Sequence, residues 1–113
     1  MTTAASHRYH ATVVLALEPA WLALDRQQRG VWAARLGAVC EAHPSVAVEW
    51  FDADGLSGRH TDFMTCRFGD LEAYQFLWDA LRDTEPFFKP YMRIVDVILG
   101  RSNGYKAYEA SLG

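Results

Sequence analysis

Two kinds of hydrophobic periodicity alternate along this chain, and their order is the feature that most constrains its fold. Short runs rich in β-branched residues predict strands, whereas longer stretches with apolar residues three and four apart predict helices. In chain order, the expected elements are strand 9–17, helix 24–43, strands 46–51 and 60–68, helix 70–83 and strand 93–99. This β-α-β-β-α-β order predicts a ferredoxin-like α+β fold, a four-stranded antiparallel sheet with both helices on one face.

Turn and capping residues set the boundaries of these elements. Asp25, with Gln28 three residues later, predicts a capping box at the start of the first helix, and Pro44 predicts its end. Glycines and aspartates within 52–58 predict the loop of a hairpin between the second and third strands. Ser102-Asn103-Gly104 predicts the start of a short C-terminal helix.

The length and composition indicate one small domain. We expect residues 1–7 to form a flexible tail and residues 8–113 to form a single domain. The two cysteines, Cys40 and Cys66, fall in a predicted helix and a predicted strand, and we expect two free, buried thiols.

Charge and hydropathy exclude two classes of partner. The net charge is −3 and the Lys and Arg residues are scattered, so we expect no nucleic-acid partner. No stretch approaches the ~20 apolar residues of a membrane span, and residues 1–7 lack the apolar run of a signal peptide. The expectation is therefore a cytoplasmic protein without a membrane partner.

Side-chain alternation within the strands predicts a second sheet face that no helix covers. In the fourth strand, the residues expected to meet the helices are Val95, Val97 and Leu99. The residues expected on the open face are Met92, Ile94, Asp96 and Ile98. The whole open face is predicted to be largely apolar and free of lysine, a composition that monomers rarely expose. We therefore expect a homodimer through this face, in the manner of dimeric α/β-barrel proteins.

Short segments between residues 19 and 112 match the pattern of a known family. They are Pro19-Ala20-Trp21-Leu22, Glu49 with Phe51-Asp52-Ala53, Arg59, Asp62-Phe63-Met64, Leu71 with Tyr74, Leu81-Arg82-Asp83-Thr84-Glu85 with Pro90-Tyr91, and Asn103-Gly104 with Tyr108-Glu109. On these residues the chain resembles the darcynin family of small bacterial proteins. The resemblance implies a dimeric α/β-barrel-like domain and brings no assigned activity.

The sequence carries no signature of a metal site, a nucleotide site or an activated nucleophile. The four histidines lie in different elements, and no pair has the helical spacing of a zinc motif. Gly55 and Gly58 are turn glycines and do not form a phosphate-binding loop. No serine lies in a nucleophile elbow and no cysteine lies beside a histidine. We expect neither a metal nor a cofactor.

Ionisable residues on the open face form the first candidate site. His10, Glu49 and Asp96 are the predicted catalytic residues, because an ionisable group in an apolar chamber must find a partner or shift its pKa. Arg67 is predicted to bind an enolate or carboxylate of the substrate. The alternative is a structural ion pair between Glu49 and Arg67 across the hairpin.

The predicted hairpin and a proline-bracketed loop supply the other substrate-binding candidates. Arg59 could bind an anionic group, with Asp62 or Asp52 handling a proton; the alternative is a solvated turn with a local ion pair. The aromatic candidates are Phe63 on the open face and Tyr91 and Phe87 beside the loop between Pro86 and Pro90. One of the last two is expected to close the mouth of the site, and the alternative is that both only pack.

Three functions fit this architecture. The first is an enzyme without a cofactor, of oxygenase or cyclase type, that acts on an aromatic or polyketide-like compound of secondary metabolism or antibiotic biosynthesis. The second is a non-catalytic small-molecule binding protein, and the third is a structural or regulatory dimer. The first is favoured here by analogy with other dimeric α/β barrels.

Overall fold

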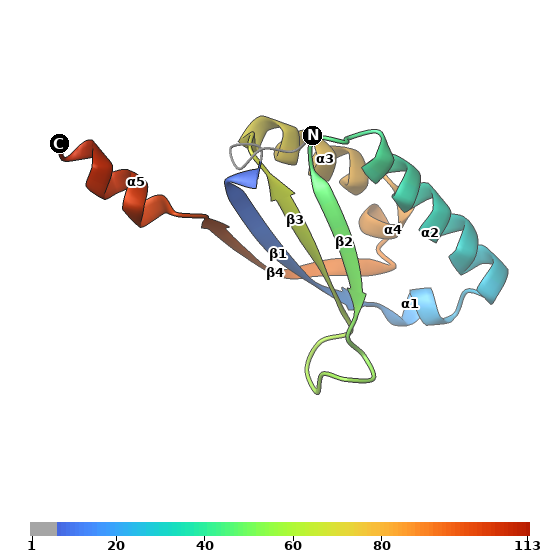
Figure 1. Cartoon of the computed structure of the whole chain (residues 1–113). Helices are drawn as coiled ribbons and strands as arrows, with labels where there is room; N and C mark the ends of the chain where they lie inside the picture. The colour runs from blue at the N-terminus through green and yellow to red at the C-terminus, as the bar shows by residue number, and fades with distance from the viewer. Residues whose placement is uncertain (1–6) are drawn as a thin grey trace.

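A computed structural model describes residues 7–113, and its strands form a single antiparallel sheet of order β2-β3-β1-β4. The elements in chain order are β1 (Tyr9–Leu17), α1 (Pro19–Leu22), α2 (Arg26–Glu41), β2 (Ala47–Asp52), β3 (Asp62–Phe68), α3 (Leu71–Arg82), α4 (Glu85–Phe88), β4 (Met92–Arg101) and α5 (Gly104–Ser111). Helices α2, α3 and α4 lie on one side of the sheet, and α5 extends away from it (Figure 1). The predicted ferredoxin-like α+β fold is confirmed. The predicted tail lies outside the described residues except for His7.

The capping box predicted at the start of α2 is present. The Asp25 carboxylate accepts a hydrogen bond from the Gln28 backbone N–H at 2.8 Å, and the Gln28 side chain accepts one from the Asp25 N–H at 3.1 Å. Two short helices were not predicted, α1 at Pro19 and α4 around Pro86. Both carry proline in their first turn, where its missing N–H costs nothing.

The core lies between the sheet and helices α2 and α3. Its buried residues are Ala11, Val13, Leu15, Leu36, Val46, Met64, Cys66, Phe68, Leu77, Trp78, Leu81 and Met92. The Phe68 ring continues this core toward α3 by stacking on Tyr74, with ring centroids 4.4 Å apart. Burial raises the pKa of the Cys66 thiol to about 11 and also raises that of half-buried Cys40, and both thiols are free.

The predicted faces of β4 were partly wrong, because a β-bulge shifts the register against β1. Val14 pairs with Asp96 and Leu15 pairs with Ile94, which leaves Val95 as the extra residue. The bulge turns Met92 and Ile94 to the helix side, where Met92 is buried and Ile94 packs on the core. Side chains alternate between the two faces of a strand, so one extra residue reverses the face predicted for the residues on one side of it.

Beyond the bulge, β4 keeps the predicted phase but lacks the predicted helical cover. Val97 and Leu99 pair with the core residues Val13 and Ala11 of β1, which places them on the helix side. Their side chains are nevertheless 43% and 50% exposed.

Among the helices that the structure describes, none has the length and apolar character needed to span a membrane.

Burial of Leu77 predicts a large effect on stability. Leu77 is fully buried in α3, whereas Leu71 in the same helix is 48% exposed. We expect Leu77→Ala to lower the free energy of unfolding by about 2–5 kcal/mol, because it leaves a cavity. Leu71→Ala, the matched control, should cost about 0.5 kcal/mol or less. Urea denaturation measures both, and equal losses would contradict the helix orientation described here.

Candidate functional site

A cavity of about 290 Å³ lies on the helix side of the sheet, beside α1 and α2. Its lining residues are Leu17, Trp21, Ala33, Leu36, Trp50, Asp52, Asp62 and Met92. Six of these eight side chains are apolar or aromatic, and the other two are carboxylic acids. Largely apolar walls with a few convergent polar groups are typical of small-molecule sites.

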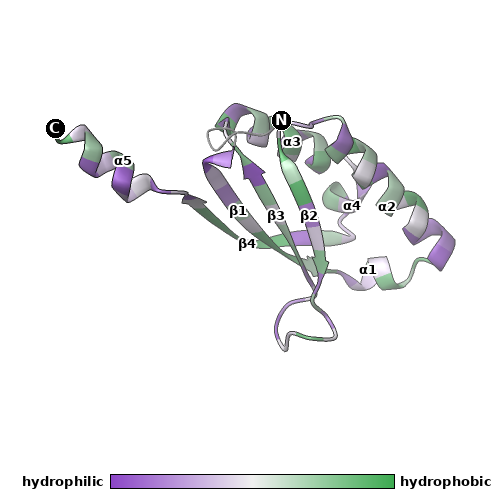
Figure 2. Ribbon diagram, viewed as in Figure 1, coloured by the Kyte–Doolittle hydropathy of each residue, from purple (hydrophilic) through white to green (hydrophobic). Residues whose placement is uncertain are grey.

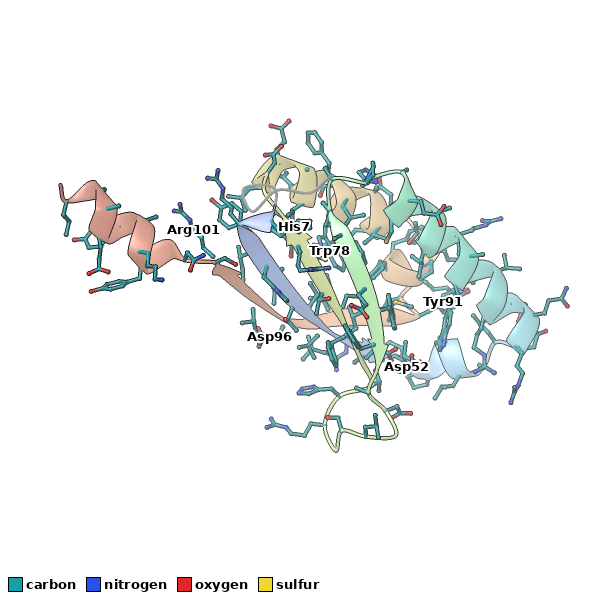
Figure 3. All side chains as sticks on the ribbon, in the orientation of Figure 1. His7, Asp52, Trp78, Tyr91, Asp96 and Arg101 are labelled. Atoms are coloured by element: carbon teal, nitrogen blue, oxygen red, sulfur yellow. The ribbon has the colours of Figure 1, made fainter. Side chains whose placement is uncertain are left out.

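The two carboxylic acids come together through the register of the hairpin. Asp52 ends β2, Asp62 begins β3, and the two are direct partners across the strands. Trp50 lies two residues before Asp52, so its side chain is on the same face of β2. Figure 3 places Asp52 at the end of β2 that lies near α1.

Asp62 is the buried polar group of this cavity. Its side chain is 5% exposed, and its Oδ2 atom accepts a hydrogen bond from Trp50 Nε1–H at 2.7 Å. Burial raises the pKa of Asp62 above its ordinary value of 3.8, and neighbouring Asp52 adds to this rise, while hydrogen bonds from Trp50 and Thr61 oppose it. Within the described chain, no basic side chain forms an ion pair with either aspartate.

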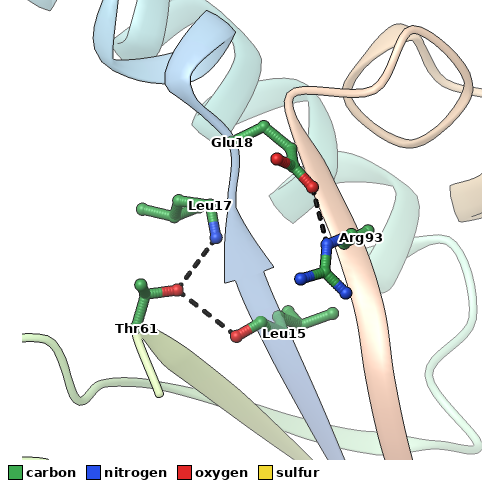
Figure 4. Close-up of polar contacts among 5 residues, drawn as sticks. All are labelled: Leu15, Leu17, Glu18, Thr61 and Arg93. Carbon is green, nitrogen blue, oxygen red and sulfur yellow. Dashed lines mark hydrogen bonds and ion pairs between the residues drawn. The ribbon is translucent and has the colours of Figure 1, made fainter. Parts of the chain in front are cut away.

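Polar contacts at the end of β1 hold the wall of the cavity in place (Figure 4). The Thr61 hydroxyl accepts a hydrogen bond from the Leu17 N–H at 2.9 Å and donates one to the Leu15 carbonyl at 3.3 Å. Arg93 Nε lies 2.8 Å from Glu18 Oε1. These contacts position Leu17 just beyond Leu15, the last β1 residue that pairs with β3.

The predicted catalytic residues lie on the opposite face of the sheet. His10 pairs with Arg67, and both are exposed. Asp96 is exposed on the side of β4 away from the helices (Figure 3), and its carboxylate accepts a hydrogen bond from the Val97 N–H at 2.9 Å. Glu49 is exposed opposite Thr65, and Arg67 is opposite Ala47. The alternative of a Glu49–Arg67 ion pair is not realised in the described chain. Catalytic roles for this set stay a prediction.

The predicted substrate-binding residues are dispersed. Phe63 stacks on Phe51 on the open face, at 4.7 Å between ring centroids, and Arg59 is exposed in the β2–β3 loop. Phe87 packs edge-on against Trp78 at 5.7 Å. Asp62 and Phe63 are consecutive in β3 and therefore face opposite sides of the sheet. This alternation separates the hairpin acids from the open-face set.

Tyr91 is buried in a polar and aromatic network outside the cavity. Its hydroxyl donates to Glu85 Oε2 at 2.7 Å and accepts from Lys89 Nζ at 3.3 Å. Its ring lies 6.1 Å from the Trp21 ring and 6.4 Å from the Trp32 ring, between centroids. Trp32 of α2 is thus part of this network and lies outside the core cluster.

Sequence reasoning missed most of the cavity wall, above all Trp21 and Met92. The alternation within β3 could have placed Asp62 on the helix side, because Met64, Cys66 and Phe68 share its parity. Trp21 depends on the unpredicted helix α1, and Met92 depends on the bulge. Pro19, which is favoured at the first helical position, is a local signal for α1, whereas the bulge has no local signal.

The fold and the cavity define a ferredoxin-like α+β domain with one helix-covered sheet face and one open face. The darcynin family model, described as a domain of unknown function, matches residues 2–111. Darcynin 1 from Acinetobacter baumannii is 34% identical over 79% of this chain and all of that protein. A darcynin homolog from Streptomyces avermitilis is 37% identical over 84% of this chain and 79% of that protein. The chain belongs to the darcynin family.

Solved structures with this fold include chlorite dismutases. One from Candidatus Nitrospira defluvii has a TM-score of 0.72 and 18% identity, and the match covers 83% of this chain. The same protein in complex with imidazole gives a TM-score of 0.73 at 18% identity. This chain spans only 39% of the length of those chains, and at such identity the likeness shows the fold alone.

The predicted function as a cofactor-independent oxygenase or cyclase was wrong. That prediction depended on what proteins of this architecture often do, and the matching structures described above are chlorite dismutases. The family description supplies no such activity either, nor a role in secondary metabolism or antibiotic biosynthesis. Function depends on the residues of a site, which many unrelated proteins build differently on one fold.

The raised pKa of Asp62 predicts a pH-dependent stability. The folded protein holds this proton more tightly than the unfolded chain, because burial disfavours the carboxylate. The contribution of Asp62 to the free energy of unfolding should therefore decrease as the pH rises from 3.8 through the folded pKa, and then level off. Asp62→Asn removes this titration and keeps an oxygen that can accept from Trp50.

Urea denaturation of both proteins across this pH range measures the effect. The difference in unfolding free energy, wild type minus variant, should become more negative as the pH rises. Asp54→Asn, which removes an exposed loop carboxyl, is the control variant. A flat difference for Asp62→Asn would contradict the effect of burial.

Proposed function

We propose that this chain binds a small, largely apolar molecule in the helix-side cavity. The observation that carries the proposal is the buried Asp62 carboxyl group in a largely apolar cavity. Burying a carboxyl group away from a basic partner is costly, so a core built only for stability would favour an apolar residue here. A ligand that hydrogen-bonds to this group would offset the cost.

Two tryptophans make the cavity suitable for a flat or ring-shaped ligand. Trp21 comes from α1 and is half-buried, and Trp50 comes from β2 and is 37% exposed. Indole rings offer a large apolar surface with little loss of side-chain entropy. Leu17, Leu36 and Met92 complete the apolar surface around the ligand.

Filling the cavity tests this proposal. Ala33 and its neighbour Ala34 are both exposed on α2, but only Ala33 lines the cavity. We expect 2-phenylethanol, a neutral aromatic probe, to shift the indole N–H signals of Trp21 and Trp50 in NMR titrations. Ala33→Trp should abolish these shifts, and the control Ala34→Trp should preserve them. Retention of the same shifts in Ala33→Trp would place binding elsewhere.

A second proposal is that the functional unit is a homodimer formed through the open sheet face. This face carries Val14, the stacked Phe51 and Phe63, and Ile98, which is 61% exposed. Its edge strand β4 is hydrophobic over most of its length (Figure 2). Monomers rarely expose a contiguous apolar patch of this kind. The cavity opens on the other side of the sheet, so dimerisation would leave it accessible.

The C-terminal helix supports the same proposal. Helix α5 has eight residues and projects from the end of β4 away from the sheet (Figure 1). Tyr105, Tyr108 and Leu112 share one side of this segment and are 73%, 60% and 69% exposed. Isolated helices of this length are marginal in water. A second copy, related by a two-fold axis, would supply a surface for each such helix.

A charge on the open face should break the dimer. We expect Ile98→Asp to produce monomers, because a buried unpaired carboxylate costs several kcal/mol. Val31→Asp is the control, since Val31 is 48% exposed on α2, away from this face. Light scattering at micromolar concentration should give twice the chain mass for the wild type and the control. A monomeric wild type would refute the dimer and leave the cavity proposal standing.

A further inference from the structure

We propose that the ligand of the helix-side cavity is an organic cation, a small apolar molecule whose protonated amine binds between Asp52 and Asp62. The inference depends on the proposed binding function and adds the chemical class of the ligand.

The ionisable groups that line the cavity are both acidic. Among the described residues that line it, the ionisable ones are Asp52 and Asp62, and α1, α2 and β4 contribute Trp21, Ala33, Leu36 and Met92. The nearby basic residue Arg93 lies outside the lining and forms an ion pair with Glu18 at 2.8 Å. An anionic ligand would therefore meet repulsion with no compensating partner, whereas a cation would complete the site.

The placement of the two acids suits an ammonium group. Asp52 and Asp62 are direct partners across β2 and β3, so both carboxyl groups lie on the same face of neighbouring strands. An ammonium group has three N–H donors, and ionised carboxylates only accept hydrogen bonds. The Trp50 N–H already donates to Asp62 Oδ2 and fixes that carboxyl group. A primary amine could then bridge both acids without another protein donor.

The aromatic rings favour the same class of ligand. Trp21 and Trp50 line the cavity beside the acids. The face of an indole ring attracts a cation more strongly than other aromatic side chains do. A neutral ligand would gain only the apolar contact with these rings.

Proton linkage gives the inference a distinct signature. The charged group that faces Asp62 within the lining is Asp52 of β2. The lining residues of α1, α2 and β4 are not ionisable. Burial and Asp52 raise the pKa of Asp62, and a bound cation would lower it again. The affinity for an amine should therefore increase as the pH rises through the folded pKa of Asp62, and binding below that pKa should release a proton.

Three probes of similar shape test the proposal by isothermal titration calorimetry: 2-phenylethylamine, 2-phenylethanol and phenylacetate. We expect the amine to bind about tenfold more tightly than the alcohol, the ratio typical of one charge-assisted hydrogen bond, and phenylacetate to bind most weakly. The preference for the amine should increase with pH in the wild type, a measurement that needs no variant. Asp62→Asn and Asp52→Asn should each reduce this preference, and Asp54→Asn should preserve it.

The outcomes separate this inference from the proposed function. Equal affinity for amine and alcohol, blocked by Ala33→Trp, would overturn the cationic ligand and support the cavity as an apolar binding site. Tighter binding of phenylacetate would also overturn it. Failure of all three probes to bind the folded wild type would refute both proposals.

Discussion

The structure depends on the burial of one face of a four-stranded sheet beneath α2 and α3. Side chains alternate across each strand, so every strand residue is assigned either to this buried face or to the open one. Ala11, Val13 and Leu15 of β1 are fully buried on the helix side. Their neighbours Thr12 and Val14 face the opposite side and are only half-buried. The core, the cavity and the uncovered surface all follow from this division.

The cavity forms where the helical layer reaches the ends of β1, β2 and β3. There α1 and α2 contribute Trp21 and Ala33, and the hairpin strands contribute Asp52 and Asp62. The Trp50–Asp62 hydrogen bond stabilises a carboxyl group that burial alone would disfavour. The same feature that costs folding energy provides the polar group by which a ligand could be recognised.

Family membership and fold similarity contribute different information. Relatives at 34% and 37% identity assign the chain to the darcynin family, whose model is described as a domain of unknown function. Chlorite dismutase structures share the fold at 18% identity. A shared backbone arrangement leaves the site residues free to differ, and the chemistry of a site depends on those residues. The proposals on function therefore start from the cavity.

The sequence by itself determined the features that depend on local physics. Asp25 and Gln28 form the predicted capping box, the predicted strands and helices occur in the predicted order with α1 and α4 added, and Leu36, Leu77 and Leu81 are core residues. The capping box depends on contacts within a few residues. The elements and the core residues follow from a hydrophobic periodicity that places apolar side chains on one buried face. The resemblance to the darcynin family was also readable from the sequence and is confirmed.

Only the tertiary structure decided which polar residues share a site. The bulge opposite Val14 and Leu15 turned Met92 inward, and the hairpin register placed Asp52 beside Asp62 on the helix side. The exposed residues His10 and Asp96 lie on the other face. Register and bulges are set by pairing between strands distant in the chain, so a single strand carries no record of them. The cavity exists only once α1, α2 and all four strands have come together, which no local pattern encodes.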